Sequence, residues 1–430
     1  MKRPEWSKMG FIAAAVGSAI GLGNIWRFPY VVGENGGGAF LIPYFIAILL
    51  FGIPVMLLEL SAGRKFKGSI TAVLNKINPK IKHLGLIPVI VLTVILSYYV
   101  VIMSWTLAYS LFSLFGYVDF AQFTSSIYPL FLFIAVIIAI TLIVSKGIKG
   151  GIEKTCKYGI PLLFLFFLIL LVKSFFLPGF SEGISFFLKP DLNSLSNPKI
   201  WMTALGQAFF SLSVGLSIML TYGSYLNKKV NLVKSSFIIT FADTLIAIVS
   251  GIIIFPIVFS FGFNPASGPE LAFVTLPKIF STMPFGNILG LLFFLALFIG
   301  ALTSAISMLE VSVSTVVDEL KVSRKKAAWF SALIIFVLGL PSALSYSSIK
   351  LQLFGKPFLD TIDHLFGTVL TPLIAAILCI LLGWFWDLDN IFMEINPQHN
   401  QRKIHHHILV VLIKYIIPIG LISLFIFEML

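Results

Sequence analysis

Ionisable side chains inside long apolar segments are the first candidates for chemistry in this sequence. Arg27, Glu59, Asp243 and Glu310 each stand within such a segment, and Asp363 lies near the end of another. An ionisable group is costly to bury among apolar residues, and in membrane segments it usually marks a substrate, ion or proton site. These five residues are therefore functional candidates before any motif is considered.

The acids Glu59 and Asp243 favour different interpretations. Glu59 suits structural support, with its carboxylate accepting hydrogen bonds from the backbone N–H groups of an interrupted helix. Asp243 has no basic residue within one or two helical turns, so it fits a cation or proton site better than a structural hydrogen bond.

Two apolar segments carry glycines and small polar residues near their middles. Residues 17–29 include three glycines, an asparagine and an arginine, and residues 206–216 include two glycines, a glutamine and two serines. One such segment alone could serve only close helix packing, because Gly17 and Gly21 form a pair of small residues four positions apart. Two at corresponding positions of an inverted repeat instead predict interrupted helices around a transporter site. Half-helix N-termini there suit a carboxylate, and freed carbonyl groups suit a cation.

The elements that must position these residues are membrane helices. The chain has 430 residues, of which 58% are hydrophobic and 11% charged, and its mean hydropathy is +1.01. A soluble enzyme needs roughly 25% charged residues, so the composition indicates a polytopic membrane protein. Two cysteines, Cys156 and Cys379, exclude a disulfide scaffold but leave one bridge open. No cleavable signal is evident, so the first segment is expected to remain as a helix.

The apolar runs predict an all-α protein with eleven membrane spans in a single transporter domain, residues 1–430. We expect two inverted five-helix repeats, at about 9–177 and 199–384, with broken helices 1 and 6 and one extra helix. A short amphipathic piece at 271–280 is predicted to lie across an outer surface. The predicted spans are 9–35, 39–63, 86–115, 128–146, 157–177, 199–226, 233–262, 285–319, 326–345, 358–384 and 406–428.

The net charge of +12 is interpreted as a record of topology rather than as a nucleic-acid signal. With the N-terminus inside, 22 of the 30 lysine and arginine residues fall in inner segments and 6 in outer ones. This asymmetry predicts a multi-pass protein of the cell membrane, with a cytoplasmic N-terminus and an extracellular C-terminus.

Several motifs together resemble the neurotransmitter:sodium symporter family, to which the bacterial leucine transporter belongs. The resemblance covers essentially the whole chain. It implies a secondary active transporter with an amino-acid site at the bilayer midplane. The matching motifs are Gly21 to Tyr30, Glu34 to Phe40, Tyr98-Tyr99, Gln207 to Ser213, Leu302-Thr303-Ser304, and Asp318-Glu319-Leu320 followed by Ser323-Arg324-Lys325.

The resemblance implies a mostly apolar substrate pocket, which suggests a hydrophobic amino acid. Gly21 stands where monoamine-carrying members have an aspartate, so the substrate is expected to bring its own carboxylate. The implied pocket residues are Ser18, Ala19, Leu22, Gly23, Ile95, Tyr99, Phe210, Ser211, Ser213, Leu216, Ser304 and Met308.

The resemblance also implies two sodium sites built from oxygen ligands, as a hard cation requires. The first would use Ala19, Asn24, Ser211 and Asp243 with the substrate carboxylate. The second would use Gly17, Ile20, Gly300, Thr303 and Ser304.

Asp243 departs from the family pattern, because the leucine transporter and chloride-dependent members have asparagine there. Chloride-dependent members also hold the anion with a serine one turn onward, where this chain has Ala247. An ionised Asp243 would supply the negative charge itself, so we expect sodium coupling without chloride. Proton cycling by Asp243 remains an alternative.

Two gates are implied by the same resemblance. The outer gate would pair Arg27 with Asp363 above the substrate, with Tyr99 and Phe210 forming an aromatic lid and Gln207 nearby. The inner gate would pair Arg3 with Asp318, supported by Trp6 and Tyr225. Alternating access would rock spans 1, 2, 6 and 7 against the others, breaking one gate as the other forms.

Other function classes fit the sequence less well. A channel would offer a continuous polar pore, whereas the polar groups here cluster at mid-depth. The histidines lie in loops or at span ends, which leaves no core metal cluster for an enzyme. An amino-acid sensor that does not transport, and a proton-coupled transporter of the same fold, remain open. Substrate identity, sodium stoichiometry and oligomeric state are not determined by the sequence.

Overall fold

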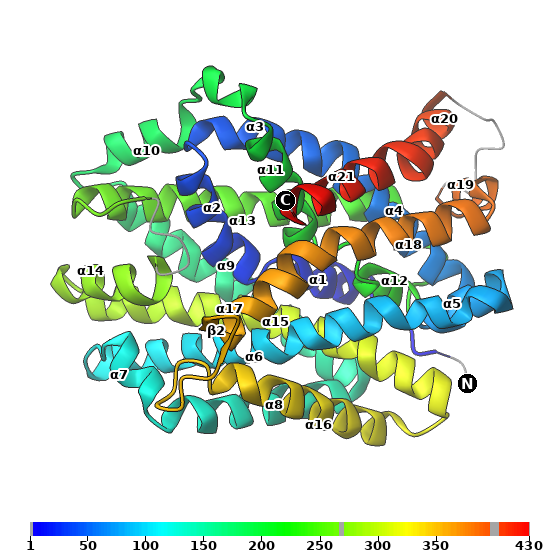
Figure 1. Ribbon diagram of the computed structural model, residues 1–430, viewed down its shortest axis with the longest axis horizontal. Helices are drawn as coiled ribbons and strands as arrows, with labels where there is room; N and C mark the ends of the chain where they lie inside the picture. Colours follow the sequence, from blue (N-terminus) through cyan, green and yellow to red (C-terminus); the bar gives the residue numbers. More distant parts are fainter. Residues whose placement is uncertain (1–2, 266–270, 396–403, 430) are drawn as a thin grey trace.

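The computed structural model describes residues 3–265, 271–395 and 404–429, and nearly all of its regular structure is helical. The long helices run along the horizontal direction of Figure 1 and pack side by side around a buried core. The N-terminal end of the chain, α5 and the turn between α15 and α16 lie at one end, which we call the N-terminal face. The opposite face carries α7 and α14.

The first half of the chain forms the first broken helix and four further spans. The broken helix comprises α1 (Lys8–Ala19), the π-helical turn η1 (Gly23–Arg27) and α2 (Phe28–Glu34). The remaining elements are α3 (Gly38–Ala47), η2 (Ile48–Gly52), α4 (Ile53–Phe66), α5 (Ile70–Ile77), η3 (Pro79–Gly85), α6 (Leu86–Phe115), α7 (Phe120–Ser125), α8 (Tyr128–Ser145), η4 (Ile148–Glu153) and α9 (Lys154–Ser174).

The second half contains the second broken helix, α11 (Pro198–Ser211) and α12 (Ile218–Gly223). A short antiparallel hairpin pairs β1 (Gln352–Leu353) with β2 (Lys356–Pro357). The remaining elements are α10 (Phe180–Leu188), η5 (Leu192–Ser196), α13 (Leu232–Ser260), η6 (Leu271–Thr275), α14 (Leu276–Thr282), α15 (Gly286–Leu320), α16 (Arg324–Ala343), α17 (Phe358–Ile362), η7 (Asp363–Leu370), α18 (Thr371–Phe385), α19 (Leu388–Ile395), α20 (Ile404–Val411), η8 (Leu412–Ile416) and α21 (Ile417–Met429).

Span counting agrees closely with the expected architecture. Among the described residues, nine helices are long and apolar enough to cross a membrane, and the first broken helix, bent by 44°, makes a tenth. The expected sixth span is divided into α11 and α12, with 14 and 6 residues. Each is shorter than the roughly 20 residues that a span requires.

Both breaks lie where the sequence predicts them, and backbone geometry explains each one. In the first, Ile20 is extended, and the glycine-rich residues that follow separate α1 from η1. In the second, Ser213, Gly215 and Ser217 all have positive φ, at 54°, 85° and 65°. Left-handed serines are strained, and such strain clusters at functional sites. A Cβ at Gly215 would lie 2.3 Å from Ala375 Cβ, so this position requires glycine.

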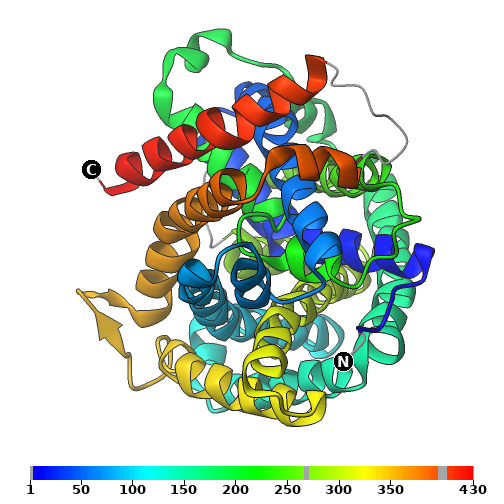
Figure 2. The ribbon, with the colours of Figure 1, turned by 90° about the vertical axis from the view of Figure 1, so that its right-hand side faces the viewer.

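The core is formed where α15 packs against α6, α9 and α16, while α1 lies between α9, α13 and α15. In Figure 2 the dark-blue start of the chain lies near the right-hand margin, and α1 runs from there toward the interior of the molecule. Cys156 and Cys379 are both buried and free, so the bridge that the sequence left open does not form. The expected amphipathic piece at 271–280 corresponds to η6 and α14, whose Phe273, Leu276 and Phe280 are buried.

Candidate functional site

The two helix breaks face each other and are joined by hydrogen bonds. Ser213 in the second break donates to the Ser18 carbonyl at 2.8 Å. Gln207 on α11 donates to the Gly23 carbonyl, also at 2.8 Å. Side chains near the second break therefore bind backbone carbonyls of the first broken helix, and the Gly23 carbonyl also accepts from the Phe28 N–H within η1.

Asn24, Ser211 and Asp243 form a buried oxygen-rich cluster beside the breaks. The Asn24 amide donates to Asp243 Oδ1 at 2.6 Å and to Ser211 Oγ at 2.8 Å. Ser211 Oγ lies 2.8 Å and 3.0 Å from the two Asp243 carboxylate oxygens. The amide oxygen of Asn24 accepts from the Gly21 N–H at 3.1 Å, which fixes the orientation of this side chain. Asp243 is fully buried, and no lysine or arginine of the described residues forms an ion pair with it.

A second oxygen cluster joins α1 to α15. Ser304 Oγ lies 3.4 Å, 3.1 Å and 3.2 Å from the carbonyl oxygens of Gly17, Ser18 and Ile20. Thr303 Oγ1 contacts the carbonyl of Gly300 at 3.0 Å. A Cβ at Gly17 would lie 3.0 Å from Thr303 Cβ. All five residues expected at the second sodium site are thus gathered at one junction.

A cavity is lined by residues of both helix breaks and by Ser304 of the second cluster. Ten of the twelve residues expected around the substrate line it. Ser18 and Ser211 do not: Ser18 donates to Ser307 at 2.8 Å, and Ser211 belongs to the Asp243 cluster. Tyr99 Oη accepts from the Leu22 N–H at 3.4 Å beside the cavity. The lining residues are Ala19, Gly21, Leu22, Gly23, Ile95, Tyr99, Phe210, Ser213, Leu216, Ile218, Ser304 and Met308.

Glu59 on α4 contacts the second helix break. Its two carboxylate oxygens accept from the N–H groups of Gly215 at 2.6 Å and Leu220 at 3.1 Å. Glu59 is fully buried. The carboxylate therefore satisfies backbone donors that the interrupted helix leaves unpaired, which is the structural arrangement considered from the sequence.

We expect Glu59→Gln to destabilise the protein. The substituted amide turns its NH₂ toward one of the two N–H donors, which leaves a buried donor unpaired at a cost of about 1–3 kcal/mol. Thermal unfolding in detergent is expected to begin several degrees lower than in the unsubstituted protein. Glu182→Gln on the exposed surface of α10 is the matched control and should leave unfolding unchanged. Equal unfolding temperatures for the two variants would refute the supporting role.

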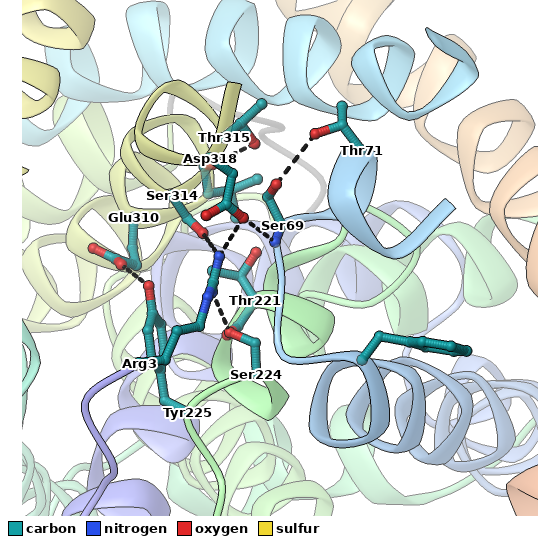
Figure 3. A network of polar contacts seen from close by, with 12 residues as sticks. Arg3, Ser69, Thr71, Thr221, Ser224, Tyr225, Glu310, Ser314, Thr315 and Asp318 are labelled. Atoms are coloured by element: carbon teal, nitrogen blue, oxygen red, sulfur yellow. Dashed lines mark hydrogen bonds and ion pairs between the residues drawn. The ribbon is translucent and has the colours of Figure 1, made fainter. Parts of the chain in front are cut away.

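Arg3 is the centre of a polar network at the N-terminal face, shown in Figure 3. Its guanidinium pairs with Asp318 at 2.5 Å and donates to Ser224 at 2.5 Å and to Ser314 at 3.0 Å. It also lies 5.1 Å from the centre of the Tyr225 ring. These contacts join the N-terminal segment to the residues after α12 and to the end of α15.

Two further contacts extend this network. Asp318 Oδ2 accepts from the Ser69 N–H at 2.7 Å, which connects it to the start of α5. The Trp6 indole N–H donates to the Tyr222 carbonyl at 3.0 Å. All four residues expected at the inner gate, Arg3, Trp6, Tyr225 and Asp318, are therefore brought together.

Glu310 belongs to the same region, with partners that the sequence does not reveal. Its buried carboxylate accepts from Tyr225 Oη at 2.6 Å and forms a two-point ion pair with Arg324 at the start of α16. Arg324 also donates to the Val144 carbonyl at 2.9 Å. A second missed pair joins Arg64 on α4 to Glu394 on α19 at 2.8 Å. Glu310 and Arg324 stand on two successive helices, 14 residues apart, and Arg64 and Glu394 are 330 residues apart in the sequence. No local sequence pattern therefore indicates either pair.

In the expected outer gate, Arg27 has other partners than the expected Asp363. Its guanidinium donates to Gln207 at 2.7 Å and lies 5.0 Å from the centre of the Phe210 ring. No ion pair joins Arg27 to Asp363 in this structure. Instead, the Asp363 carboxylate and the Tyr98 hydroxyl both lie close to Gly367. The expected gate residues thus lie in one region, but the expected ion pair is not formed.

Comparison with known proteins identifies the family. The model of the Sodium:neurotransmitter symporter family matches residues 3–128 and 119–430. The chain belongs to this family. It is 36% identical to the sodium-dependent transporter YhdH of Bacillus subtilis (strain 168) over 439 residues, which cover 99% of this chain and 97% of that protein. The human taurine transporter, described as sodium- and chloride-dependent, is 28% identical over 468 residues, covering 93% of this chain and 74% of that protein.

A solved structure agrees with this assignment. The crystal structure of MhsT in complex with L-phenylalanine matches with a TM-score of 0.90 and 37% sequence identity, and the match covers 99% of each chain. The protein is therefore a multi-pass membrane transporter of the family, with sodium as the coupled ion, and not an enzyme. No group of three or more metal-binding His, Cys, Asp or Glu side chains occurs in the part of the chain that the structure describes.

Proposed function

We propose that this transporter is a sodium-coupled symporter of hydrophobic amino acids that operates by alternating access without chloride. The observation that supports it most is the Asn24, Ser211 and Asp243 cluster beside the cavity at the helix breaks. This arrangement places a buried acid and amide and hydroxyl oxygens beside a space lined mainly by apolar side chains. Such surroundings suit a cation and an amphipathic substrate together.

The cavity favours a substrate with a carboxylate and an apolar side chain. Ile95, Leu216, Ile218 and Met308 provide apolar walls. Gly21 adds no acidic group beside the cavity, so the substrate would have to supply its own carboxylate. A Cβ at this position would lie only 2.5 Å from Ser304 Oγ, so the first break admits no larger residue there. The bound L-phenylalanine of MhsT supports the same substrate class.

Two sodium ions are proposed at the two oxygen clusters. The first would be held by the Ala19 carbonyl, Asn24, Ser211 and Asp243 with the substrate carboxylate. The second would be held by the carbonyl oxygens of Gly17, Ile20 and Gly300 and by the hydroxyls of Thr303 and Ser304. Because the substrate carboxylate completes the first set, binding of substrate and of sodium should reinforce each other.

Chloride independence is proposed from the charge at the first cluster. Asp243 supplies a buried negative charge, and Ala247 one turn onward has no hydroxyl to hold an anion. An added chloride would therefore face like-charge repulsion without compensating donors.

Alternating access is proposed to rock spans 1, 2, 6 and 7, which come from both inverted repeats (about 9–177 and 199–384), against the other spans. The N-terminal face would be cytoplasmic, as the distribution of basic residues indicates. In the described arrangement the Arg3 network closes this face, whereas Arg27 and Asp363 are not paired at the other. Opening the cytoplasmic side would require Arg3 to leave Asp318.

We expect Arg3→Ala to populate inward-open states. The substitution removes an ion pair and two hydrogen bonds, and charged hydrogen bonds contribute about 1.5–3 kcal/mol each. A cysteine at Ala15, which is buried on α1, should then react with a polar thiol reagent about tenfold faster when both native cysteines are replaced by alanine. Lys8→Ala, which removes an exposed charge from the same segment, is the control. Unchanged labelling in Arg3→Ala would contradict this gate.

A competition screen in proteoliposomes tests the substrate class. Each of the twenty amino acids would compete with a labelled hydrophobic amino acid under an inward sodium gradient, with chloride replaced by gluconate. Aliphatic or aromatic amino acids should compete best, and acidic and basic ones should not compete. Saturable binding without accumulation would instead indicate the sensor, and accumulation driven by a proton gradient alone would indicate the proton-coupled transporter.

A further inference from the structure

Helix α13 carries a column of hydroxyl groups on the face that bears Asp243. Ser236, Thr240 and Thr244 are spaced four residues apart, and Asp243 stands three residues after Thr240. With 3.6 residues per turn, these four side chains lie on one side of the helix. The column therefore extends from the buried acid to within about one turn of Leu232, where α13 begins near the N-terminal face.

The hydroxyls of this column are buried and have no hydrogen-bond partner. Ser236 is 0% exposed and Thr240 is 5% exposed, and none of the three hydroxyls is hydrogen-bonded. Hydroxyls inside membrane helices usually donate to the preceding turn, as Ser250 on the same helix does to the Ile246 carbonyl at 2.7 Å. A buried polar group left unpaired costs about 1–3 kcal/mol. Three such groups in a row call for a partner that the protein itself does not provide.

The helices that pack against α13 contribute a further group of the same kind. α13 contacts α1 and α4, and on α4 the hydroxyl of Ser61 is also fully buried and unpaired. Ser61 lies five residues before the end of α4, and Ser236 lies four residues after the start of α13. Because these two helix ends lie at the same face, the two serines are at a similar depth, about one turn inside the protein.

We propose that this column is the pathway by which the sodium ion at Asp243 leaves toward the N-terminal face. Hydroxyl oxygens and accompanying water would replace the ligands that the ion loses at Asn24 and Ser211, as a hard cation requires. The pathway is occluded while α1 packs against α13, and it becomes hydrated when α1 moves away. This inference rests on the proposed function, because it assigns an exit to the first sodium site.

Cysteine accessibility tests the pathway independently of amino-acid uptake. Cysteines would be introduced singly at Ser236 and Thr240, after replacing Cys156 and Cys379 by alanine, and exposed in detergent to a cationic methanethiosulfonate reagent. We expect both to react in sodium-free buffer with N-methylglucamine, and to react at least tenfold more slowly at saturating sodium. Ser250→Cys on the same helix, buried and outside the column, is the control and should remain unreactive in both buffers.

Near-isosteric variants test whether the hydroxyls serve the moving ion. Thr240→Val removes one hydroxyl and keeps the side-chain shape, and Ser250→Ala is its control. Thr240→Val should slow release of radioactive sodium from the protein about tenfold while leaving equilibrium sodium binding unchanged. A release rate equal to that of Ser250→Ala, or cysteines that are unreactive or react without regard to sodium, would overturn the proposal.

The outcomes also separate this inference from the proposed function. If sodium protects the cysteine at position 240 but no amino acid is accumulated, the proposed symport fails while the pathway stands. If uptake is normal but sodium gives no protection, the pathway fails while symport stands. Protection by protons in place of sodium would overturn the assignment of the column to sodium.

Discussion

Asp243→Asn is expected to reduce sodium-driven amino-acid uptake by at least 100-fold in chloride-free medium. Asp243 is the buried acid of the cluster with Asn24 and Ser211, and its ionised carboxylate is the charge proposed to bind sodium. A unit charge about 4 Å from a cation contributes about 4 kcal/mol at an effective dielectric constant of 20, roughly 1000-fold in affinity. The measurement is initial uptake into proteoliposomes as a function of sodium concentration.

A paired variant makes this test specific for the missing charge. In Asp243→Asn with Ala247→Ser, the added hydroxyl offers a donor to an anion one turn along α13. Added chloride should restore amino-acid uptake in the double variant, whereas uptake by Asp243→Asn alone should stay low. Glu182→Gln, which removes an exposed acid from α10, should behave like the unsubstituted protein. Normal chloride-free uptake by Asp243→Asn would exclude Asp243 as the charge that sodium requires.

Gly21→Asp is expected to abolish amino-acid uptake. A Cβ at Gly21 would lie 2.5 Å from Ser304 Oγ and 2.9 Å from Tyr99 Oη, so any side chain displaces two hydroxyls at the cavity. The aspartate also places a charge where the substrate carboxylate is proposed to bind, and like charges at such distances repel strongly. Binding of a labelled hydrophobic amino acid and its uptake should both be lost.

Alanine variants separate the steric effect from the charge. Gly21→Ala should weaken binding less than Gly21→Asp, because only the close contacts are introduced. Gly206→Ala in the second broken helix is the control, since a Cβ there meets only Leu424 at 3.6 Å. Unaltered transport by Gly21→Asp in reconstituted vesicles would refute the assignment of the cavity to the substrate.

The broken helices and the residues around them could be predicted from the sequence, because their signals are local. The glycines, Asn24 and the serines of the second break stand out against apolar surroundings. The resemblance then identified Asp243, Thr303 and Ser304 as their neighbours, and the structure places them in the two oxygen clusters.

Other contacts could not be predicted, because they depend on how distant segments pack. Glu310 stands ten residues before the end of α15, about 15 Å along that helix, and nothing in the sequence indicates its pairing with Arg324. The partner of Arg27 depends on the arrangement of the whole outer region, so the expected pairing with Asp363 is replaced by Gln207. The hydroxyl residues of α13 recur every four positions in the sequence, but only the structure shows that their hydroxyls lack hydrogen-bond partners.

Accumulation of a labelled hydrophobic amino acid in chloride-free proteoliposomes, driven only by a sodium gradient, tests the central proposal most directly. The proposed mechanism predicts concentration of the amino acid above its external level, which collapses when a sodium ionophore is added. The unsubstituted protein should accumulate it, and Asp243→Asn should not. Accumulation that needs chloride, or that persists without a sodium gradient, would contradict the proposed coupling.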